Sequence, residues 1–196
     1  MSDSQTSVRG FIDGFVPGLQ VISGCMFAGK SEELIRRLKR WQHSRLGVVT
    51  LKPARDTRSE NVCSRNGCSL EAVEVQTSEQ ILTIVQESDK VIGIDEIHFF
   101  DPQIVEVVLR LVRKGKLVIV SGLNLDFAEK PFENTMKLMA LASNVTIAFA
   151  VCDICRSQYA TRSQLLVPST GRILVGDKEY SPRCIECFQT PPSTPL

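Results

Sequence analysis

The segment Gly24-Cys25-Met26-Phe27-Ala28-Gly29-Lys30-Ser31 has the pattern G-x-x-x-x-G-K-[ST] of a phosphate-binding loop. The run 19–23 before it predicts a strand, and residues 31–43 after it carry apolar side chains at helical spacing. The pattern requires this order, because the loop's N–H groups and the helix N-terminus together bind phosphate oxygens. Lys30 would reach the β- and γ-phosphates of a nucleotide, and the Ser31 hydroxyl would ligate Mg²⁺. The segment therefore predicts a nucleotide-binding fold.

The rest of the chain repeats an alternation of strand and helix patterns. Apolar runs of the strand type occur at 21–22, 48–51, 91–94, 117–120 and 145–148. Helical patterns lie between them, around 31–43, 78–87, 102–113 and 131–142. Strands that are apolar throughout and alternate with helices predict a parallel sheet covered on both faces. We therefore expect an α/β fold of the P-loop NTPase type.

Changes in composition divide the chain of 196 residues into four parts. We expect a flexible leader at 1–17 and a P-loop α/β domain at 18–150. Cysteine pairs, glycine and charge mark a small zinc-binding lobe at 151–188, which we call the cysteine lobe. The Pro-rich end, 189–196, is expected to be disordered.

Charge and hydropathy indicate which partners to expect. The formal net charge is +1, which gives no reason to expect nucleic acid or an anionic membrane as a partner. There is no apolar run of 18 residues and no secretory signal pattern, so we expect a cytoplasmic protein. In that compartment the seven cysteines are expected to be thiols or metal ligands rather than disulfides.

An acidic pair follows the apolar run 91–94. Asp95 and Glu96 stand where the carboxyl end of a buried strand would place them beside the phosphate loop. One carboxylate can hold Mg²⁺, and the other can orient or deprotonate an attacking hydroxyl group. His98 follows them, and packing or hydrogen bonding, rather than catalysis, is the expected role of such a single histidine.

Two C-x-x-C pairs, Cys152 with Cys155 and Cys184 with Cys187, are separated by 28 residues. Four thiolates complete a tetrahedral zinc site and leave no open position, so a zinc ion here is expected to be structural. The cysteine lobe that the metal would anchor is a candidate lid over an acceptor substrate. Cys25, inside the phosphate loop, is either a reactive thiol or an inert small residue.

In these motifs and their order the chain resembles the type II thymidine kinases, the cellular cytosolic kind, over about residues 18–188. The matching segments are 23–31, 52–58, 92–100, 122–123 with 126–132, and the two C-x-x-C pairs. The resemblance implies transfer of the γ-phosphate of ATP to the 5′-hydroxyl group of thymidine. It also implies a homotetramer, nucleotide salvage for DNA synthesis, and feedback inhibition by dTTP.

The resemblance also assigns roles to single residues. It implies that Glu96 is the general base, that Lys30 and Arg58 act on the transferred phosphate, and that Ser31, Asp56 and Asp95 lie at the magnesium ion. It implies a thymidine pocket formed by Met26, Phe99, Leu123, Phe127, Phe132, Thr161, Val175, Gly176 and Tyr180. The chain departs from the family pattern at His98, where glutamine is usual, at Asn124, where aspartate is frequent, and at Cys25.

Two other functions fit parts of the sequence. A P-loop ATPase or GTPase could use the cysteine lobe as a docking module. A zinc-ribbon nucleic-acid binder would need basic and aromatic residues between the cysteine pairs, and the segment 156–183 contains both. The phosphate loop and the acidic pair favour the kinase over both alternatives.

Overall fold

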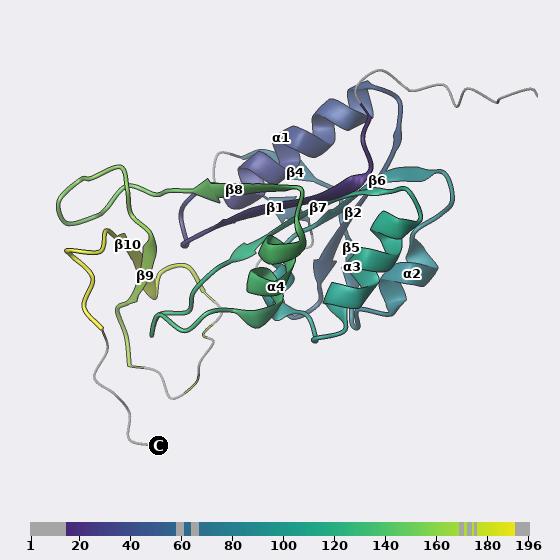
Figure 1. The fold of residues 1–196 in the computed structure, drawn as a ribbon. Coiled ribbons are helices and arrows are strands. Elements are labelled where there is room, and N and C mark those ends of the chain that lie inside the picture. Colours follow the sequence, from purple (N-terminus) through teal and green to yellow (C-terminus); the bar gives the residue numbers. More distant parts are fainter. Residues whose placement is uncertain are drawn as a thin grey trace, which may run out of the picture.

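A computed structural model describes residues 15–57, 61–63, 67–168, 171, 174 and 176–190. At its centre lies a six-stranded sheet in the order β5-β2-β6-β7-β1-β8, in which every pair of neighbours is parallel (Figure 1). The strands are β1 (Gly18–Gly24), β2 (Gly47–Pro53), β5 (Val73–Val75), β6 (Asp89–Ile94), β7 (Leu117–Leu123) and β8 (Asn144–Ala148). The five strands expected from the apolar runs are all present, and the predicted parallel sheet is confirmed.

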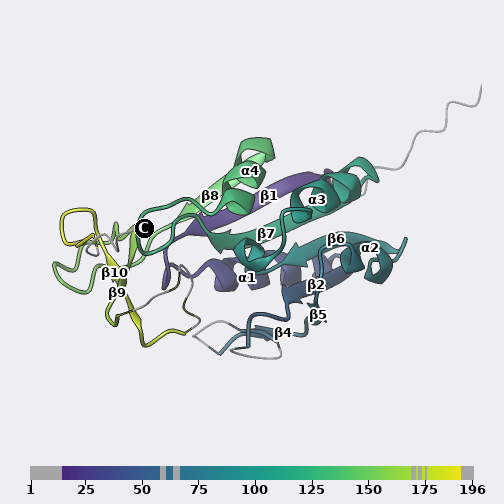
Figure 2. The same ribbon diagram turned by 90° about the horizontal axis from the view of Figure 1, so that it is seen from below.

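Helices cover both faces of the sheet, as the continuous apolar strands require. Helix α1 (Lys30–His43) packs on one face, and α3 (Ile104–Arg113) and α4 (Glu133–Leu141) pack on the other (Figures 1 and 2). The short α2 (Gln80–Ile84) lies against α3. Each face therefore has its own apolar core, one around Leu34 and Leu38 of α1 and one around Val107 and Leu111 of α3.

Helix α1 packs directly on strand β6 at a glycine, which leaves room for a side chain of the helix. A Cβ atom at Gly93 would lie 2.3 Å from a methyl carbon of Leu38. Leu34, Ile35 and Leu38 are fully buried on this side, in agreement with the helical spacing of the sequence. The close contact fixes the start of α1, and with it the phosphate loop, relative to the sheet.

The helix expected at 78–87 is shorter than predicted, because contacts from distant segments end it at both sides. Before it, the Ser78 N–H and hydroxyl group donate to Asp101, both at 2.9 Å. After it, the buried ammonium group of Lys116 donates hydrogen bonds to the carbonyl oxygens of Gln86, Glu87 and Asp89 at 3.0, 3.0 and 2.6 Å. These carbonyl groups are thereby drawn out of helical geometry.

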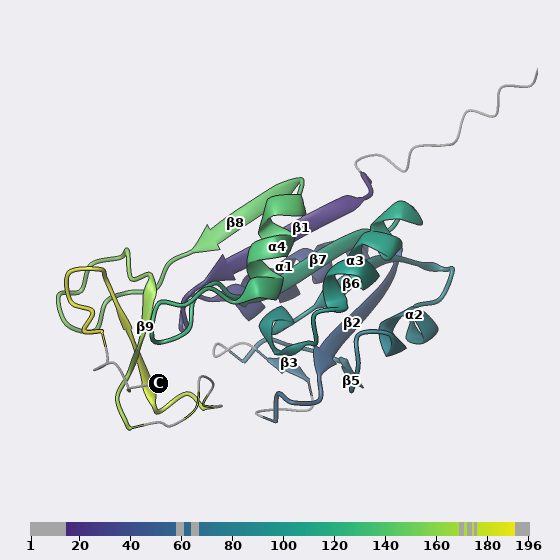
Figure 3. The same ribbon diagram turned by 60° about the horizontal axis from the view of Figure 1, so that its bottom comes forward.

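Two small antiparallel sheets stand apart from the main sheet. One consists of β3 (Val62–Cys63) and β4 (Ser69–Leu70). The other consists of β9 (Arg162–Leu165) and β10 (Tyr180–Arg183) and belongs to the cysteine lobe. Figure 3 shows the arrowheads of β1 and β8 pointing toward this lobe, so it lies at the carboxyl ends of the strands. Among the described residues, no helix is both long and apolar enough to cross a membrane.

Candidate active site

The phosphate loop connects β1 to α1 and contains two residues with left-handed backbone. Phe27 has φ 68° and Gly29 has φ 76°, a conformation that costs a non-glycine residue about 1 kcal/mol. Such turns aim successive N–H groups at one point and form an anion-binding concavity. At the start of the loop, a Cβ atom at Gly24 would lie 2.2 Å from the carbonyl oxygen of Ala148 in β8. The first glycine of the motif is therefore required by packing.

The side chain of Lys30 lies across the loop that it belongs to. Its Nζ donates to the carbonyl oxygen of Cys25 at 2.7 Å, and the residue is 9% exposed. The ammonium group is thus held over the anion-binding concavity. Burial is the main reason that the pKa of the Cys25 thiol is raised, against the opposing charge of Lys30. Of the two interpretations of Cys25, the structure favours the inert small residue.

Asp95 lies at the carboxyl end of β6, beside the phosphate loop. Its carboxylate accepts hydrogen bonds from the hydroxyl groups of Ser31 and Ser121. Burial, reinforced by the charge of Glu96, raises the pKa of Asp95 to about 6, although these hydrogen bonds oppose the rise. Ser31 and Asp95, both predicted magnesium ligands, therefore lie side by side. Their oxygen atoms are the ligand type that Mg²⁺ prefers.

Asp95→Asn is expected to stabilise the nucleotide-free protein above pH 6. The folded state raises the pKa from 3.8 to about 6, so it holds the proton more tightly than the unfolded chain does. Stability then falls as the pH rises through this window. Removing the charge should raise the free energy of unfolding by about 1–3 kcal/mol at pH 8, and by much less at pH 4.

Urea unfolding at the two pH values measures this difference. The exposed Glu87→Gln is the control, and we expect it to change stability by less than about 0.5 kcal/mol. An Asp95→Asn variant that is less stable than the wild type at pH 8 would contradict the prediction.

Glu96 follows directly and has a strained backbone, with φ 51°. Its carboxylate lies beside His98, whose Nδ1 is 3.4 Å from Glu96 Oε2. Both side chains are buried, at 9% and 2% exposed. A buried carboxylate beside the phosphate loop, held in a strained conformation, has the position expected of a general base.

Aromatic side chains gather on the other side of His98. Its ring centroid lies 4.2 Å from that of Phe99 and 4.7 Å from that of Phe132. Phe99 also lines a pocket with Arg55 and Asp101. The backbone N–H of Leu123, at the end of β7, donates to His98 Nδ1 at 3.3 Å. Three residues predicted to wall the nucleoside pocket, Phe99, Leu123 and Phe132, are therefore brought together around His98, which contacts Glu96.

The cysteine lobe contacts the phosphate loop directly. Ser163 of β9 accepts the N–H of Met26 at 3.0 Å, and the Cys25 thiol donates to the carbonyl oxygen of Ala160 at 3.2 Å. The third contact is an ion pair between Arg162 Nε and Glu129 Oε1, which are 2.6 Å apart. Glu129 lies in the loop that carries Phe127. The lobe is thus attached both to the phosphate loop and to the loop that carries Phe127, a predicted wall of the nucleoside pocket.

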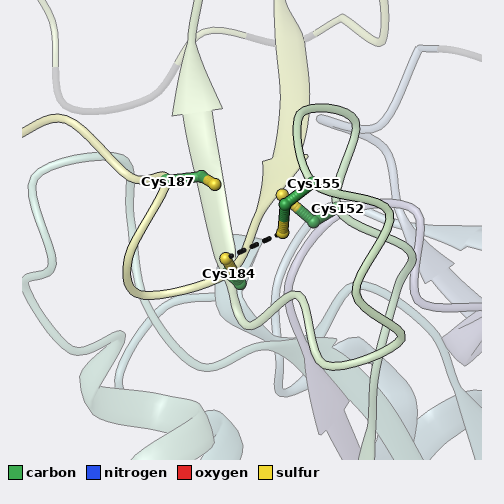
Figure 4. Close-up of side chains that lie close together, drawn as sticks. All are labelled: Cys152, Cys155, Cys184 and Cys187. Atoms are coloured by element: carbon green, nitrogen blue, oxygen red, sulfur yellow. Dashed lines mark hydrogen bonds between the residues drawn. The ribbon is translucent and has the colours of Figure 1, made fainter.

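The four cysteines of the two C-x-x-C pairs converge in this lobe (Figure 4). Their sulfur atoms all lie within 4.8 Å of one another, and those of Cys155 and Cys184 are 3.5 Å apart. A tetrahedral zinc site with Zn–S bonds of about 2.3 Å needs sulfur atoms about 3.8 Å apart. The cluster fits a structural zinc ion, which would close the lobe at its base.

The other predicted site residues vary in what surrounds them. Asp56 is buried and pairs with Lys52 Nζ at 3.6 Å. Tyr180 is buried and donates to the carbonyl oxygen of Leu174 at 3.0 Å. Thr161 and Gly176 are half-buried in the cysteine lobe. Arg58 and Val175 lie outside the described residues.

The sequence reasoning missed Ser121, Ser163 and the contact between His98 and Glu96. Ser121 follows the apolar run 117–120 just as Asp95 follows 91–94, so the same strand-end argument could have found it. The contact of Ser163 with Met26 depends on how distant segments meet. The contact of His98 with Glu96, two positions away, depends on the left-handed backbone at Glu96, for which the sequence carries no signal.

Known proteins are similar to this chain in sequence and, more distantly, in structure. The sequence model of the thymidine kinase family matches residues 18–188. Among solved structures, the flagellar accessory protein FlaH from Methanocaldococcus jannaschii is 15% identical, with 67% of this chain and 71% of that chain covered and a TM-score of 0.47. The Legionella pneumophila ATPase DotB is 19% identical, with 66% and 35% covered and a TM-score of 0.41. Both structural likenesses are too distant to carry an argument, but the family match spans most of the chain, and the protein belongs to the thymidine kinase family.

Proposed function

We propose that the protein is a type II thymidine kinase, which transfers the γ-phosphate of ATP to the 5′-hydroxyl group of thymidine and yields dTMP for nucleotide salvage. One observation carries the proposal beyond the family match. Glu96 follows Asp95, which accepts a hydrogen bond from Ser31 of the phosphate loop, and its carboxylate lies 3.4 Å from Nδ1 of His98, whose ring packs against Phe99 and Phe132. A candidate base, the phosphate loop and aromatic side chains suited to packing on a flat ring are thereby connected through Asp95 and His98.

The chemistry assigns a task to each of these groups. Glu96 would accept the proton of the 5′-hydroxyl group as its oxygen attacks the γ-phosphorus atom. Lys30 and the loop's N–H groups would balance the charge that builds on the phosphate oxygens. Ser31, Asp95 and Asp56 are the residues that would hold Mg²⁺, which supplies charge neutralisation when bound. Aligning the two substrates provides most of the remaining acceleration.

A phosphotransfer assay with a panel of acceptors tests this proposal. ADP release is measured with ATP and Mg²⁺, with each common nucleoside in turn and with no acceptor. We expect release that depends on thymidine and far exceeds the blank. Release without any nucleoside would favour the P-loop ATPase or GTPase. Retention of nucleic acid with no ADP release would favour the zinc-ribbon binder.

We propose that the cysteine quartet binds a structural zinc ion that keeps the lobe on the phosphate loop. Cys184→Ser removes one of four thiolates, so we expect bound zinc to fall from about one equivalent to a small fraction of that. The contacts of Ser163 and Ala160 with the loop then loosen. We expect the KM for thymidine to rise about tenfold or more, and more than the KM for ATP.

Zinc content by atomic emission and steady-state kinetics measure the two effects. Cys63→Ser, an exposed cysteine outside the quartet, is the matched control and should leave both unchanged. Full zinc content in Cys184→Ser would contradict the assignment of the ligands. Loss of zinc with an unchanged KM would contradict a lid role for the lobe.

We also propose that the enzyme is a cytoplasmic homotetramer inhibited by dTTP. The edge strand β8 and the neighbouring helix α4 present exposed apolar side chains, with Val145, Ile147, Phe149 and Met136 between 39% and 49% exposed. Such a patch supports association between copies.

Three measurements test these proposals. Light scattering measures the mass in solution, and inhibition that thymidine relieves would place dTTP in the nucleoside pocket. Cell fractionation tests the compartment.

A further inference from the structure

His98 joins the two halves of the candidate site through one ring nitrogen. Its Nδ1 lies 3.4 Å from Glu96 Oε2, and the same atom accepts the Leu123 N–H at 3.3 Å. Glu96 is the proposed base, while Leu123 ends β7 and borders the nucleoside pocket. The histidine therefore connects the group that removes the proton to the wall that would hold the nucleoside.

The ring has little freedom to make other arrangements. Its side chain is 2% exposed and packs against the tilted rings of Phe99 and Phe132. From the third side β7 comes so close that a Cβ atom at Gly122 would lie 3.3 Å from Nδ1. A ring confined on these sides holds its nitrogen at a fixed point, which is what the orientation of a carboxylate requires.

The two contacts make opposite demands on the nitrogen. In a neutral imidazole, Nδ1 either carries a proton, and can donate to the Glu96 carboxylate, or lacks one, and can accept from the Leu123 N–H. A primary amide meets both demands at once, because its carbonyl oxygen accepts while its nitrogen donates. An aliphatic side chain of similar size meets neither.

We propose that His98 is a positioning residue: when Nδ1 carries a proton it donates to the Glu96 carboxylate and holds it in the alignment needed for proton removal, and when Nδ1 lacks one it accepts the Leu123 N–H instead. The inference rests on the proposed function, because it takes Glu96 as the base. The contacts with the two phenylalanine rings alone would predict a purely packing role. The two roles rank substitutions in opposite order, since packing favours an apolar side chain and positioning favours an amide.

The kinetic test compares His98→Gln with His98→Leu. We expect His98→Leu to lower kcat about 10- to 100-fold with less than a threefold change in the KM for ATP. His98→Gln should retain at least a third of the wild-type kcat. In a Glu96→Gln background, replacing His98 by leucine should have little further effect, because the two residues act as a unit. His43→Gln and His43→Leu, on the exposed end of α1, are the controls.

A spectroscopic test does not depend on activity. The chain contains two histidines, so ¹⁵N-labelled imidazole gives two resolvable sets of signals. We expect Glu96→Gln to shift the Nδ1 signal of His98 and to leave that of His43 in place. An unshifted His98 signal, or a leucine variant that outperforms the glutamine variant, would overturn the proposal. Absence of thymidine-dependent turnover in the wild type would instead refute the proposed function, and the spectrum would still decide whether His98 and Glu96 interact.

Discussion

Lys30→Ala is expected to lower kcat by about a thousandfold, the upper range for loss of one preorganised donor of positive charge. The ammonium group is buried over the phosphate loop, where it bonds the Cys25 carbonyl oxygen at 2.7 Å. In such a site, a positive charge near the transferred phosphate interacts far more strongly than it would in water. Steady-state kinetics with saturating ATP and thymidine measure the loss.

Two further variants separate charge from folding. Lys39→Ala, on the same helix, should keep kcat within about twofold. Lys30→Arg retains the charge but changes its geometry, so we expect an intermediate loss. Circular dichroism checks that α1 still forms when Lys30 is replaced. A kcat within tenfold of the wild type in a folded Lys30→Ala variant would contradict the assigned role.

Glu96→Gln is expected to lower kcat by about a hundredfold or more while ATP binding stays within about threefold. Glutamine has nearly the same shape as glutamate but does not accept the proton of the 5′-hydroxyl group, so the loss measures general-base catalysis. The strained backbone at φ 51° and the contact with His98 hold the side chain in place in both forms. Single-turnover kinetics isolate the chemical step from product release.

The exposed Glu106→Gln on α3 is the matched control. It removes a carboxylate that pairs with Arg110 and Arg113 at the surface, and such pairs contribute little. An unchanged kcat in Glu96→Gln would show that another group removes the proton, whatever the effect of Lys30→Ala.

Much of the fold could be predicted because its signals are local. Each of these signals is contained in a short segment of the chain. Examples are the glycines and Lys30 of the phosphate loop, the buried residues on one side of α1, and the apolar strand before Asp95. Parallel strands bring their carboxyl ends to one edge of a sheet, so the amino-acid sequence alone predicts that Asp95 lies beside the loop. The hydrogen bond between Ser31 and Asp95 agrees with this prediction.

The parts that escaped prediction depend on long-range contacts. Hydrogen bonds from Lys116 to backbone carbonyl groups shorten the helix expected at 78–87. Lys116 lies about 30 positions further along the chain than the carbonyl groups of Gln86 and Glu87. The contact of Ser163 with Met26 spans 137 positions. Strand β5, only three residues long, gains its place by pairing with β2. Neither local propensity nor periodicity contains this information.

The most direct test of the central claim follows the phosphate itself. The purified, zinc-loaded protein is incubated with γ-³²P-labelled ATP, Mg²⁺ and thymidine, and the labelled products are separated. We expect the label to appear in dTMP, in a molar amount equal to the ADP formed. With Glu96→Gln, labelled dTMP should form at least a hundredfold more slowly. Label recovered as inorganic phosphate at the same rate with and without thymidine would contradict the account and identify a hydrolase.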